Sequence, residues 1–185
     1  MDLMQAIKER RSIRTYKSNP VPDNMIQDVL EAARWAPSWA NTQCWEYILV
    51  KDAETKKALA GTLPSANPAK PAITEAPIII VACAQLEKSG YFKEKAATDK
   101  GDWFMFDLGL STQNLVLAAH CLGLGTVHVG LFDAQAASKI LSVPESMAIV
   151  ELIPLGFPSV SAKVTARKEL KDIISYDKYG QREMD

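Results

Sequence analysis

The chain has 185 residues, of which 48% are hydrophobic and 23% charged, a composition typical of folded globular domains and unlike that of disordered or collagen-like proteins. Lysine and arginine total 21 against 22 acidic residues, so the net charge of -1 provides no general attraction for nucleic acid. A chain of this length is expected to form one domain over residues 1–185.

Cysteine usage and hydrophobicity indicate a cytoplasmic protein that does not enter the membrane. The three cysteines, Cys44, Cys83 and Cys121, are far apart, and neither they nor the two histidines have a metal-ligand spacing. The N-terminus lacks the apolar core of a signal peptide. The most hydrophobic segment, residues 103–124, is interrupted by polar residues, so we expect no membrane-spanning helix.

In chain order, the first elements are two helices separated by an extended segment. Residues 2–10 are predicted as a short amphipathic helix, and Pro20 and Pro22 then force extended backbone. Asp23 is expected to cap a second helix, which should stop before Pro37.

Strands and helices are expected to alternate along the rest of the chain. WEYILVK is predicted as a strand, AETKKALA as a helix closed by Gly61, LPSANPAKPA as a proline-rich loop and PIIIVACA as a strand buried on both faces. Residues 85–102 are predicted as an exposed excursion or lid. The predicted helices are residues 2–10, 23–36, 53–60, 103–124 and 133–141; the predicted strands are residues 45–51, 77–84, 125–130 and 147–155; a last extended or helical piece is expected near residues 168–176. The pattern indicates one mixed layer structure of helices and strands. Periodicity alone does not predict the order of the strands in the sheet.

The common catalytic motifs are missing from the sequence. There is no Walker phosphate loop and no GxSxG elbow, and Gly123-Leu124-Gly125 follows a helix and precedes a strand, the reverse of the dinucleotide-binding order. No serine or cysteine nucleophile is paired with either histidine. We therefore expect neither a catalytic nucleophile nor a metal site.

Two segments carry chemistry. RRSIR, residues 10–14, offers three guanidinium groups and a hydroxyl, which bind phosphate oxygens through charge-assisted hydrogen bonds, unless the segment is simply a solvated helix end. In PSWANTQ, residues 37–43, amide and hydroxyl side chains lie in a turn between a helix and a strand. They can contact the polar edge of a flat ring, or they can satisfy the backbone of an ordinary turn.

Together these segments resemble the FMN-dependent nitroreductase family. RRSIRTY, a helix and then AARWAPSWANTQCWEYILV are similar to the opening of that family, and the likeness continues through APIIIVACA, DLGLSTQNLVLAAHCLGLGT, VHVG and LGFP to a downstream arginine. The resemblance covers nearly the whole chain. It implies an α+β fold with a mixed, largely antiparallel central sheet flanked by helices, in an intertwined homodimer with FMN at the subunit interface.

The resemblance also assigns residues to the cofactor. RRSIR, which we call the arginine segment, and Arg167 near the C-terminus match residues that hold the FMN phosphate or the polar edge of the flavin. Lys168 is a weaker match to the same role. Residues 37–43 match a loop that the partner subunit lays against the flavin, the SANPAK loop resembles a second flavin contact, and residues 127–130 resemble a backbone segment beside it. His128 is either a flavin neighbour or a satisfied core histidine. The cofactor-binding residues so implied are Arg10, Arg11, Ser12, Arg14, Pro37, Ser38, Trp39, Asn41, Gln43, Asn67, Lys70, Val127, His128, Val129, Gly130 and Arg167.

The implied activity is transfer of a hydride from NADH or NADPH through FMN to a nitro compound, quinone or similar acceptor, by a ping-pong mechanism. Two positions depart from the family: Cys44 stands where a proline is common, and Trp39 stands where a small residue is common and would narrow the substrate face. Three alternatives remain open. They are a flavin-dependent dehalogenase or flavin-destroying enzyme with residues 85–102 as its lid, a flavin-storage protein plugged by Trp39, and an interaction module that binds no flavin.

Overall fold

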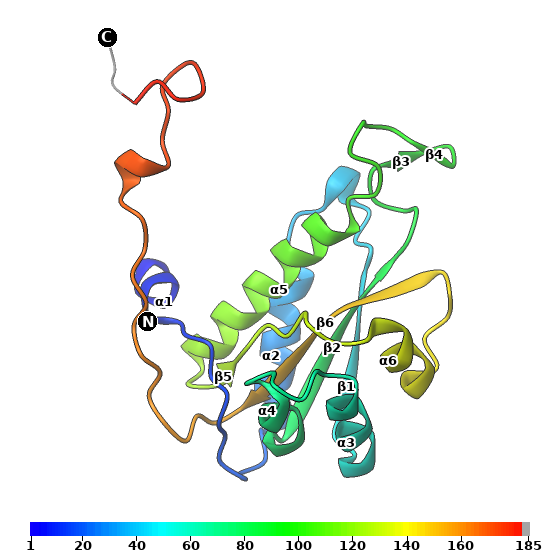
Figure 1. Cartoon of the computed structure of the whole chain (residues 1–185), viewed down its shortest axis with the longest axis vertical. Coiled ribbons are helices and arrows are strands. Elements are labelled where there is room, and N and C mark those ends of the chain that lie inside the picture. The colour runs from blue at the N-terminus through cyan, green and yellow to red at the C-terminus, as the bar shows by residue number, and fades with distance from the viewer. Residues whose placement is uncertain (183–185) are drawn as a thin grey trace.

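The computed structural model describes residues 1–182 and shows helices on both faces of a four-stranded sheet (Figure 1). The elements are α1 (Leu3–Glu9), α2 (Asp23–Arg34), a 3₁₀ turn η1 (Trp39–Asn41), β1 (Trp45–Val50), α3 (Ala53–Gly61), α4 (Lys70–Glu75), β2 (Ile78–Gln85), β3 (Tyr91–Phe92), β4 (Lys95–Ala96), α5 (Phe104–Cys121), β5 (Gly125–Thr126), α6 (Ala134–Leu141), β6 (Met147–Gly156) and η2 (Leu170–Asp172).

The sheet has the order β1-β2-β6-β5, and every neighbouring pair is antiparallel. β2 and β6 shift register between Ala82 and Cys83, which marks a bulge. A separate two-stranded hairpin, β3-β4, lies within the excursion of residues 85–102. The largely antiparallel sheet flanked by helices agrees with the fold that the resemblance implied.

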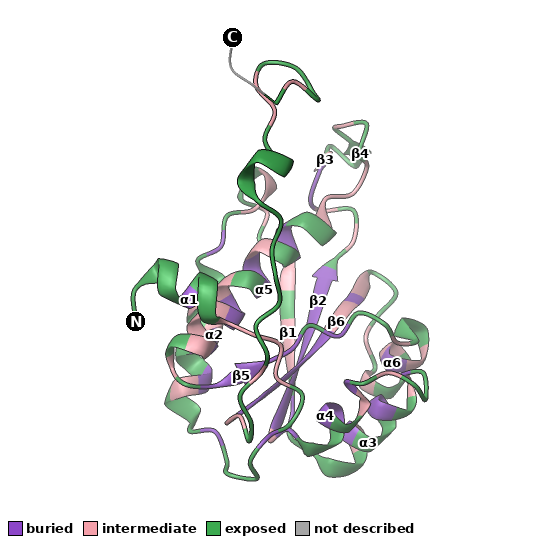
Figure 2. Ribbon diagram, turned by 60° about the vertical axis from the view of Figure 1, so that its left-hand side comes forward, coloured by how far each residue is buried: buried purple, intermediate pink, exposed green. Residues whose placement is uncertain are grey.

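Two cores form because successive side chains of β2 point to opposite faces of the sheet. Ile79 and Val81 join the core that includes α3, α4 and α6, whereas Ile78 and Ile80 join the core with α2 and α5. These four side chains are almost fully buried, and the ribbon of β2 has the colour of buried residues in Figure 2. The uninterrupted apolar run of β2, which predicted a strand buried on both faces, is confirmed.

The C-terminal segment leaves the body of the molecule after β6 and runs past α1 with little regular structure (Figures 1 and 2). Several of its apolar side chains are strongly exposed, among them Val164 at 77% and Leu170 at 69%. Over residues 1–182, no helix has the length and apolar character required to cross a membrane.

Five local predictions need correction. Asp23 is the first residue of α2 rather than its cap, and its carboxylate pairs with Lys51 Nζ at 3.1 Å. Gly61 lies inside α3, which Thr62 caps. The proline-rich loop contains the start of α4, because a proline in the first turn of a helix needs no hydrogen-bond donor.

The fourth correction concerns residues 125–130, of which only Gly125 and Thr126 form a strand. Val129 makes an isolated antiparallel bridge to Leu152 instead. The helix predicted over residues 103–124 is shorter, spanning Phe104–Cys121, and the chain then turns at Gly123 with a φ of +77°.

Candidate cofactor site

The arginine segment is held against β5 by its own backbone. Ile13 N donates to the Thr126 carbonyl at 2.8 Å, and Ser12 forms a parallel bridge with Thr126. The approach is close enough that a Cβ on Gly125 would lie 2.7–2.8 Å from three carbon atoms of the Ile13 side chain. Glycine at position 125 therefore allows residues 10–14 to lie at the edge of the sheet.

A cavity of about 520 Å³ opens on one side of this segment. We call it the arginine cavity; its lining includes Arg10, Arg11, His120, Thr126, Ser159 and Ser161. Within residues 1–182, three buried side-chain nitrogen atoms have no hydrogen-bond partner, namely Arg10 Nη1, Arg11 Nε and His120 Nε2. All three belong to residues that line this cavity. Burial of unpartnered donors is costly, so the cavity has the chemistry of an anion site.

Positive charge is concentrated around Arg10. Burial lowers the pKa of the Arg10 guanidinium, and the neighbouring charges of Arg11 and Arg167 lower it further. The late arginine named in the sequence analysis therefore lies near enough to interact electrostatically with Arg10. In this chain Arg167 is exposed, and its Nη1 donates to Thr165 Oγ1 at 2.8 Å. Lys168, next along the same segment, is exposed.

A second cavity, of about 360 Å³, is lined in part by Arg14 and Val127, the residues that follow Ile13 and Thr126 in the two paired segments. We call it the two-loop cavity because two loops, residues 64–69 and 127–131, supply most of its lining, together with Arg14. Asn67 joins the loops: its Nδ2 donates to the Leu131 carbonyl at 3.1 Å, and its Oδ1 accepts from Ala69 N at 2.9 Å. Lys70 does not line this cavity, and its Nζ instead donates to the Leu63 carbonyl at 3.2 Å.

His128 belongs to the two-loop cavity and not to the core. Its side chain is 36% exposed, and its Nδ1 lies 2.7 Å from Glu151 Oε2. The alternative that His128 is a core histidine is therefore wrong, because the side chain is not buried. The ring nevertheless has a polar partner in Glu151. Val127 and Val129 point into the core, so this segment presents its backbone and His128 to the cavity.

The loop of residues 37–43 lies at the other end of the molecule and is unusually constrained. Ala40, Asn41 and Gln43 have left-handed φ angles of 46°, 56° and 47°, and none of them is glycine. Ser38 Oγ accepts from Gln43 N at 2.9 Å, which closes the turn. The side chains of Asn41 and Gln43 remain exposed. Such strain persists only where the surroundings hold the conformation in place.

Asp107, which the sequence analysis did not select, supplies that support. Its fully buried carboxylate accepts from Trp39 N at 3.0 and 3.1 Å and lies 3.4 Å from Thr42 Oγ1. Ser89, in the excursion, also donates its hydroxyl to Asp107. A polar residue in an apolar helix is easily taken for a mere interruption of a hydrophobic segment, whereas here it is the anchor of the loop.

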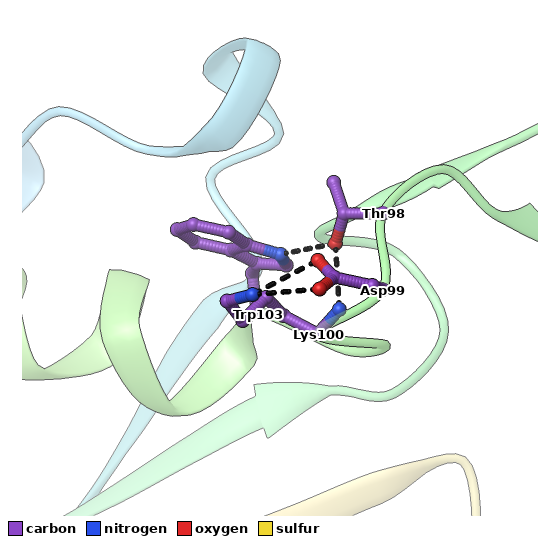
Figure 3. A network of polar contacts seen from close by, with 4 residues as sticks. All are labelled: Thr98, Asp99, Lys100 and Trp103. Carbon is purple, nitrogen blue, oxygen red and sulfur yellow. Dashed lines mark hydrogen bonds and ion pairs between the residues drawn. The ribbon is translucent and has the colours of Figure 1, made fainter.

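The excursion itself is ordered by short-range contacts. Trp103 Nε1 donates to Thr98 Oγ1 at 2.9 Å, and Lys100 pairs with Asp99, as Figure 3 shows. Gly90 must be glycine, because its φ is +82° and a Cβ would lie 2.4 Å from Trp103 Cδ1. Phe92, at the hairpin, is 67% exposed. The excursion is thus a built structure that adjoins the 37–43 loop through Ser89 and Asp107.

The predicted residues therefore fall into two groups at opposite ends of α5 (Figure 1). Asp107, beside the 37–43 loop, and His120, in the arginine cavity, are 13 positions apart in α5, which corresponds to about 20 Å along the helix axis. Residues 10–14, 67 and 127–130 come together around the two cavities. The 37–43 loop does not join them within one chain.

Comparisons with known proteins agree with this arrangement. The family model described as the nitroreductase family matches residues 7–157. A protein of Methanothermobacter thermautotrophicus, provisionally named NADH dehydrogenase/NAD(P)H nitroreductase, is 33% identical over 86% of this chain and 78% of its own. The FMN reductase [NAD(P)H] of Bacillus subtilis is 27% identical over 85% of this chain and 66% of its own.

Among solved structures, a nitroreductase family protein of Clostridium difficile superimposes with a TM-score of 0.83 at 25% identity, covering 96% of this chain and 99% of its own. The family model alone spans most of the sequence, including the arginine segment, the 37–43 loop and both strands that form the centre of the sheet. The chain belongs to the nitroreductase family.

Proposed function

We propose that this protein passes a hydride from NADH or NADPH through FMN to a small acceptor such as a nitro compound or quinone, by a ping-pong mechanism. Membership in the family carries the coarser statement, that the chain is an FMN-dependent NAD(P)H oxidoreductase. The finer statement, which concerns the acceptor and the order of steps, rests on how the two cavities and the 37–43 loop are arranged.

The unpartnered nitrogens of the arginine cavity are the observation that carries the proposal. A phosphate monoester has nearly two negative charges and three acceptor oxygens, which match Arg10 Nη1 and Arg11 Nε in both charge and hydrogen-bonding role. Ser12 and Arg167 are further phosphate ligands in this proposal. The residues present therefore fit the phosphate end of FMN.

The two-loop cavity is the proposed site of the flavin ring. It adjoins the arginine cavity because both cavities are lined by the same two paired segments. Arg10, Arg11 and Thr126 line the arginine cavity, and Arg14 and Val127, further along these segments, line the two-loop cavity. A molecule with a phosphate at one end and a flat ring at the other can span this border. Arg14 and Asn67 would face the polar edge of the ring, and residues 127–130 would lie along it.

A second copy of the chain completes the proposed site. The 37–43 loop is held rigidly by Asp107 but lies about 20 Å from the arginine cavity, so its exposed Asn41 and Gln43 side chains reach a flavin only if the flavin belongs to a partner. Exposed apolar residues in α1, including Leu3 at 67%, and in the C-terminal segment support a homodimer. In the proposed dimer these surfaces are covered.

FMN, held at its phosphate by Arg10, Arg11 and Ser12, would supply the hydride chemistry between the nicotinamide and the acceptor. The chain's own part is to bind the phosphate, to place the Arg14 charge near the electron-accepting edge of the ring and to leave one face open. The Trp39 side chain, partly exposed beside Asn41, would limit the thickness of an acceptor stacked on that face. Successive use of one face by donor and acceptor gives ping-pong kinetics.

Visible spectroscopy of the purified protein under anaerobic conditions tests this proposal. We expect a flavin spectrum that bleaches on addition of NADH or NADPH and returns on addition of a quinone. A bound flavin that does not bleach would favour storage instead. A protein that remains colourless and takes up no added FMN would contradict the proposal altogether.

A further inference from the structure

We propose that His120 is a further phosphate-binding residue of the arginine cavity and takes up a proton when the phosphate binds. The inference rests on the proposed function, because it assigns the arginine cavity to the phosphate of FMN. It adds a titrating ligand that lies outside the arginine segment and would make FMN affinity depend on pH.

The position of His120 carries the inference. The residue lies in the last turn of α5, and its Nε2 is buried without a hydrogen-bond partner. It lines the same cavity as Arg10 and Arg11, whose Nη1 and Nε are the other two unpartnered atoms. The three residues come from two separate segments of the chain and line one cavity, as expected of groups that surround one anion.

A phosphate would gain a third donor from this arrangement. Arg11 Nη1 already donates to the carbonyls of Lys8 and Arg10, whereas Nε of that guanidinium is buried and has no partner. An imidazole protonated on Nε2 can donate a hydrogen bond to a phosphate oxygen, and a doubly protonated imidazole adds a positive charge. The end of α5 also favours that charge, because the last turn of a helix carries partial negative charge.

The charged groups around His120 set the direction of its response. Burial lowers the pKa of His120, the charges of Arg10 and Arg11 lower it further, and Glu9 opposes them. Lys17 and the N-terminal residue Met1 also line the cavity, whereas the C-terminal residues 158–162 that line it are uncharged. The free site therefore favours the neutral form of His120. A bound phosphate offsets the two arginines and raises the pKa of the imidazole again.

The sign of the pH effect follows from this linkage. When a ligand raises the pKa of a group, its affinity increases as the pH falls from the bound-state pKa toward the free-state pKa. Protonation of the phosphate itself, with a pKa of about 6, opposes this increase because it removes ligand charge. The contribution of His120 is therefore measured as the difference between the wild type and a variant that lacks the titrating group.

The experiment measures dissociation constants for FMN and for riboflavin, by quenching of flavin fluorescence, between about pH 6 and pH 8. His120→Gln keeps a neutral donor and removes the titration, and His120→Ala removes both. Cys121→Ser, an exposed neighbour on the same turn that does not line the cavity, is the matched control. Thermal melting of each apoprotein reports whether a variant is folded. If His120→Ala is not folded, the FMN and riboflavin dissociation constants of His120→Gln are used for the test instead.

We expect His120→Ala to weaken FMN binding roughly tenfold to a hundredfold at the acidic end, the scale of one charge-assisted hydrogen bond, and to leave riboflavin binding within about twofold. The affinity of the wild type relative to His120→Gln should rise about fivefold or more from pH 8 to pH 6. The wild type could bind FMN better than riboflavin while the ratio of its FMN affinity to that of His120→Gln stays constant between pH 8 and pH 6. That result would overturn the role of His120 but not the phosphate placement. Equal binding of FMN and riboflavin by the wild type would overturn both this inference and the phosphate placement.

Discussion

The arginine segment and the 37–43 loop both carry polar side chains at the ends of secondary structure, yet they differ in how those groups are satisfied. Around the arginine segment, Arg10 and Arg11 retain buried nitrogens without partners. In the loop, the backbone is tied to Asp107 and Ser38, and the exposed side chains are paired, since Gln43 Nε2 donates to Asn41 Oδ1 at 3.2 Å. Unsatisfied buried groups indicate a ligand in the same chain, whereas a rigid, internally satisfied loop is suited to contact a partner's site.

The largest expected effect comes from removing the charges of the arginine segment. The double variant Arg10→Ala/Arg14→Ala should weaken FMN binding by at least about a hundredfold, because each lost charge-assisted contact costs about 1.5–3 kcal/mol. The fold should survive, since both side chains lie outside the two hydrophobic cores. Flavin occupancy after purification and circular dichroism together measure the result.

Arg34→Ala is the matched control for that variant, because Arg34 is an exposed arginine paired with Glu31 on α2, away from both cavities. Surface pairs of this kind contribute at most about 1 kcal/mol. A double variant that kept its flavin at full occupancy would show that the arginine cavity does not hold the phosphate.

A smaller effect is expected at the loop end, from Asp107→Asn. The carboxamide retains one acceptor oxygen but turns an NH₂ donor toward groups that also donate, so we expect a loss of about 1–3 kcal/mol in the free energy of unfolding. Loosening of the loop should lower turnover and change FMN affinity little, because the proposed phosphate site lies at the other end of α5. Thermal melting, flavin titration and steady-state kinetics separate these effects.

The matched control is Asp99→Asn, an exposed carboxylate in the excursion that pairs with Lys100. It should behave like the wild type in all three measurements. If Asp107→Asn instead released FMN as completely as the arginine double variant, the functional separation of the two ends would be lost.

Gly125→Ala tests the close approach that aligns the arginine segment. The added Cβ would overlap the Ile13 side chain, so the segment must shift, at a cost of about 1–3 kcal/mol in stability and with weaker FMN binding. Gly61→Ala is the control, because nothing lies within 4 Å of a Cβ there and alanine is the better helix residue. Denaturant unfolding should show a lower free energy of unfolding than the wild type for Gly125→Ala and a higher one for Gly61→Ala.

The smallest effect concerns thiol reactivity. Burial, reinforced by the charge of Asp107, raises the pKa of Cys44 to about 11, whereas Cys121 is exposed. Because the thiolate is the reactive form, iodoacetamide near pH 8 should label Cys121 well before Cys44. Mass spectrometry of the digested protein measures the order. Rapid labelling of Cys44 would mean that the loop end opens readily, against the rigid loop inferred here.

The sequence predicted the elements with long apolar segments and the segment with dense charge. β1, β2, β6 and α5 lie within a few residues of the apolar segments that predicted them. The start of α4 was missed because Pro71 resembles a loop residue, although the first turn of a helix accepts proline.

Asp107 and His120, two of several polar residues in α5, could not be selected from the sequence. Each is one polar residue among others in a mainly apolar helix, and its significance depends on what the fold brings beside it. For Asp107 these are the backbone of Trp39 and the hydroxyl of Ser89; for His120 they are the free nitrogens of two arginines. Contacts of this kind form between segments far apart in the chain, which local patterns do not record.

Mixed dimers test the central claim most directly, namely that the arginine segment of one chain and the loop of the other form one site. One chain carries Arg10→Ala/Arg14→Ala and the other carries Asn41→Ala/Gln43→Ala, and each is expected to be inactive alone. In a mixed dimer, one site then has both changes and the other has neither, so an equal mixture should recover roughly a quarter of the wild-type activity. If the loop served its own chain, no site would be intact, and the mixture would remain inactive.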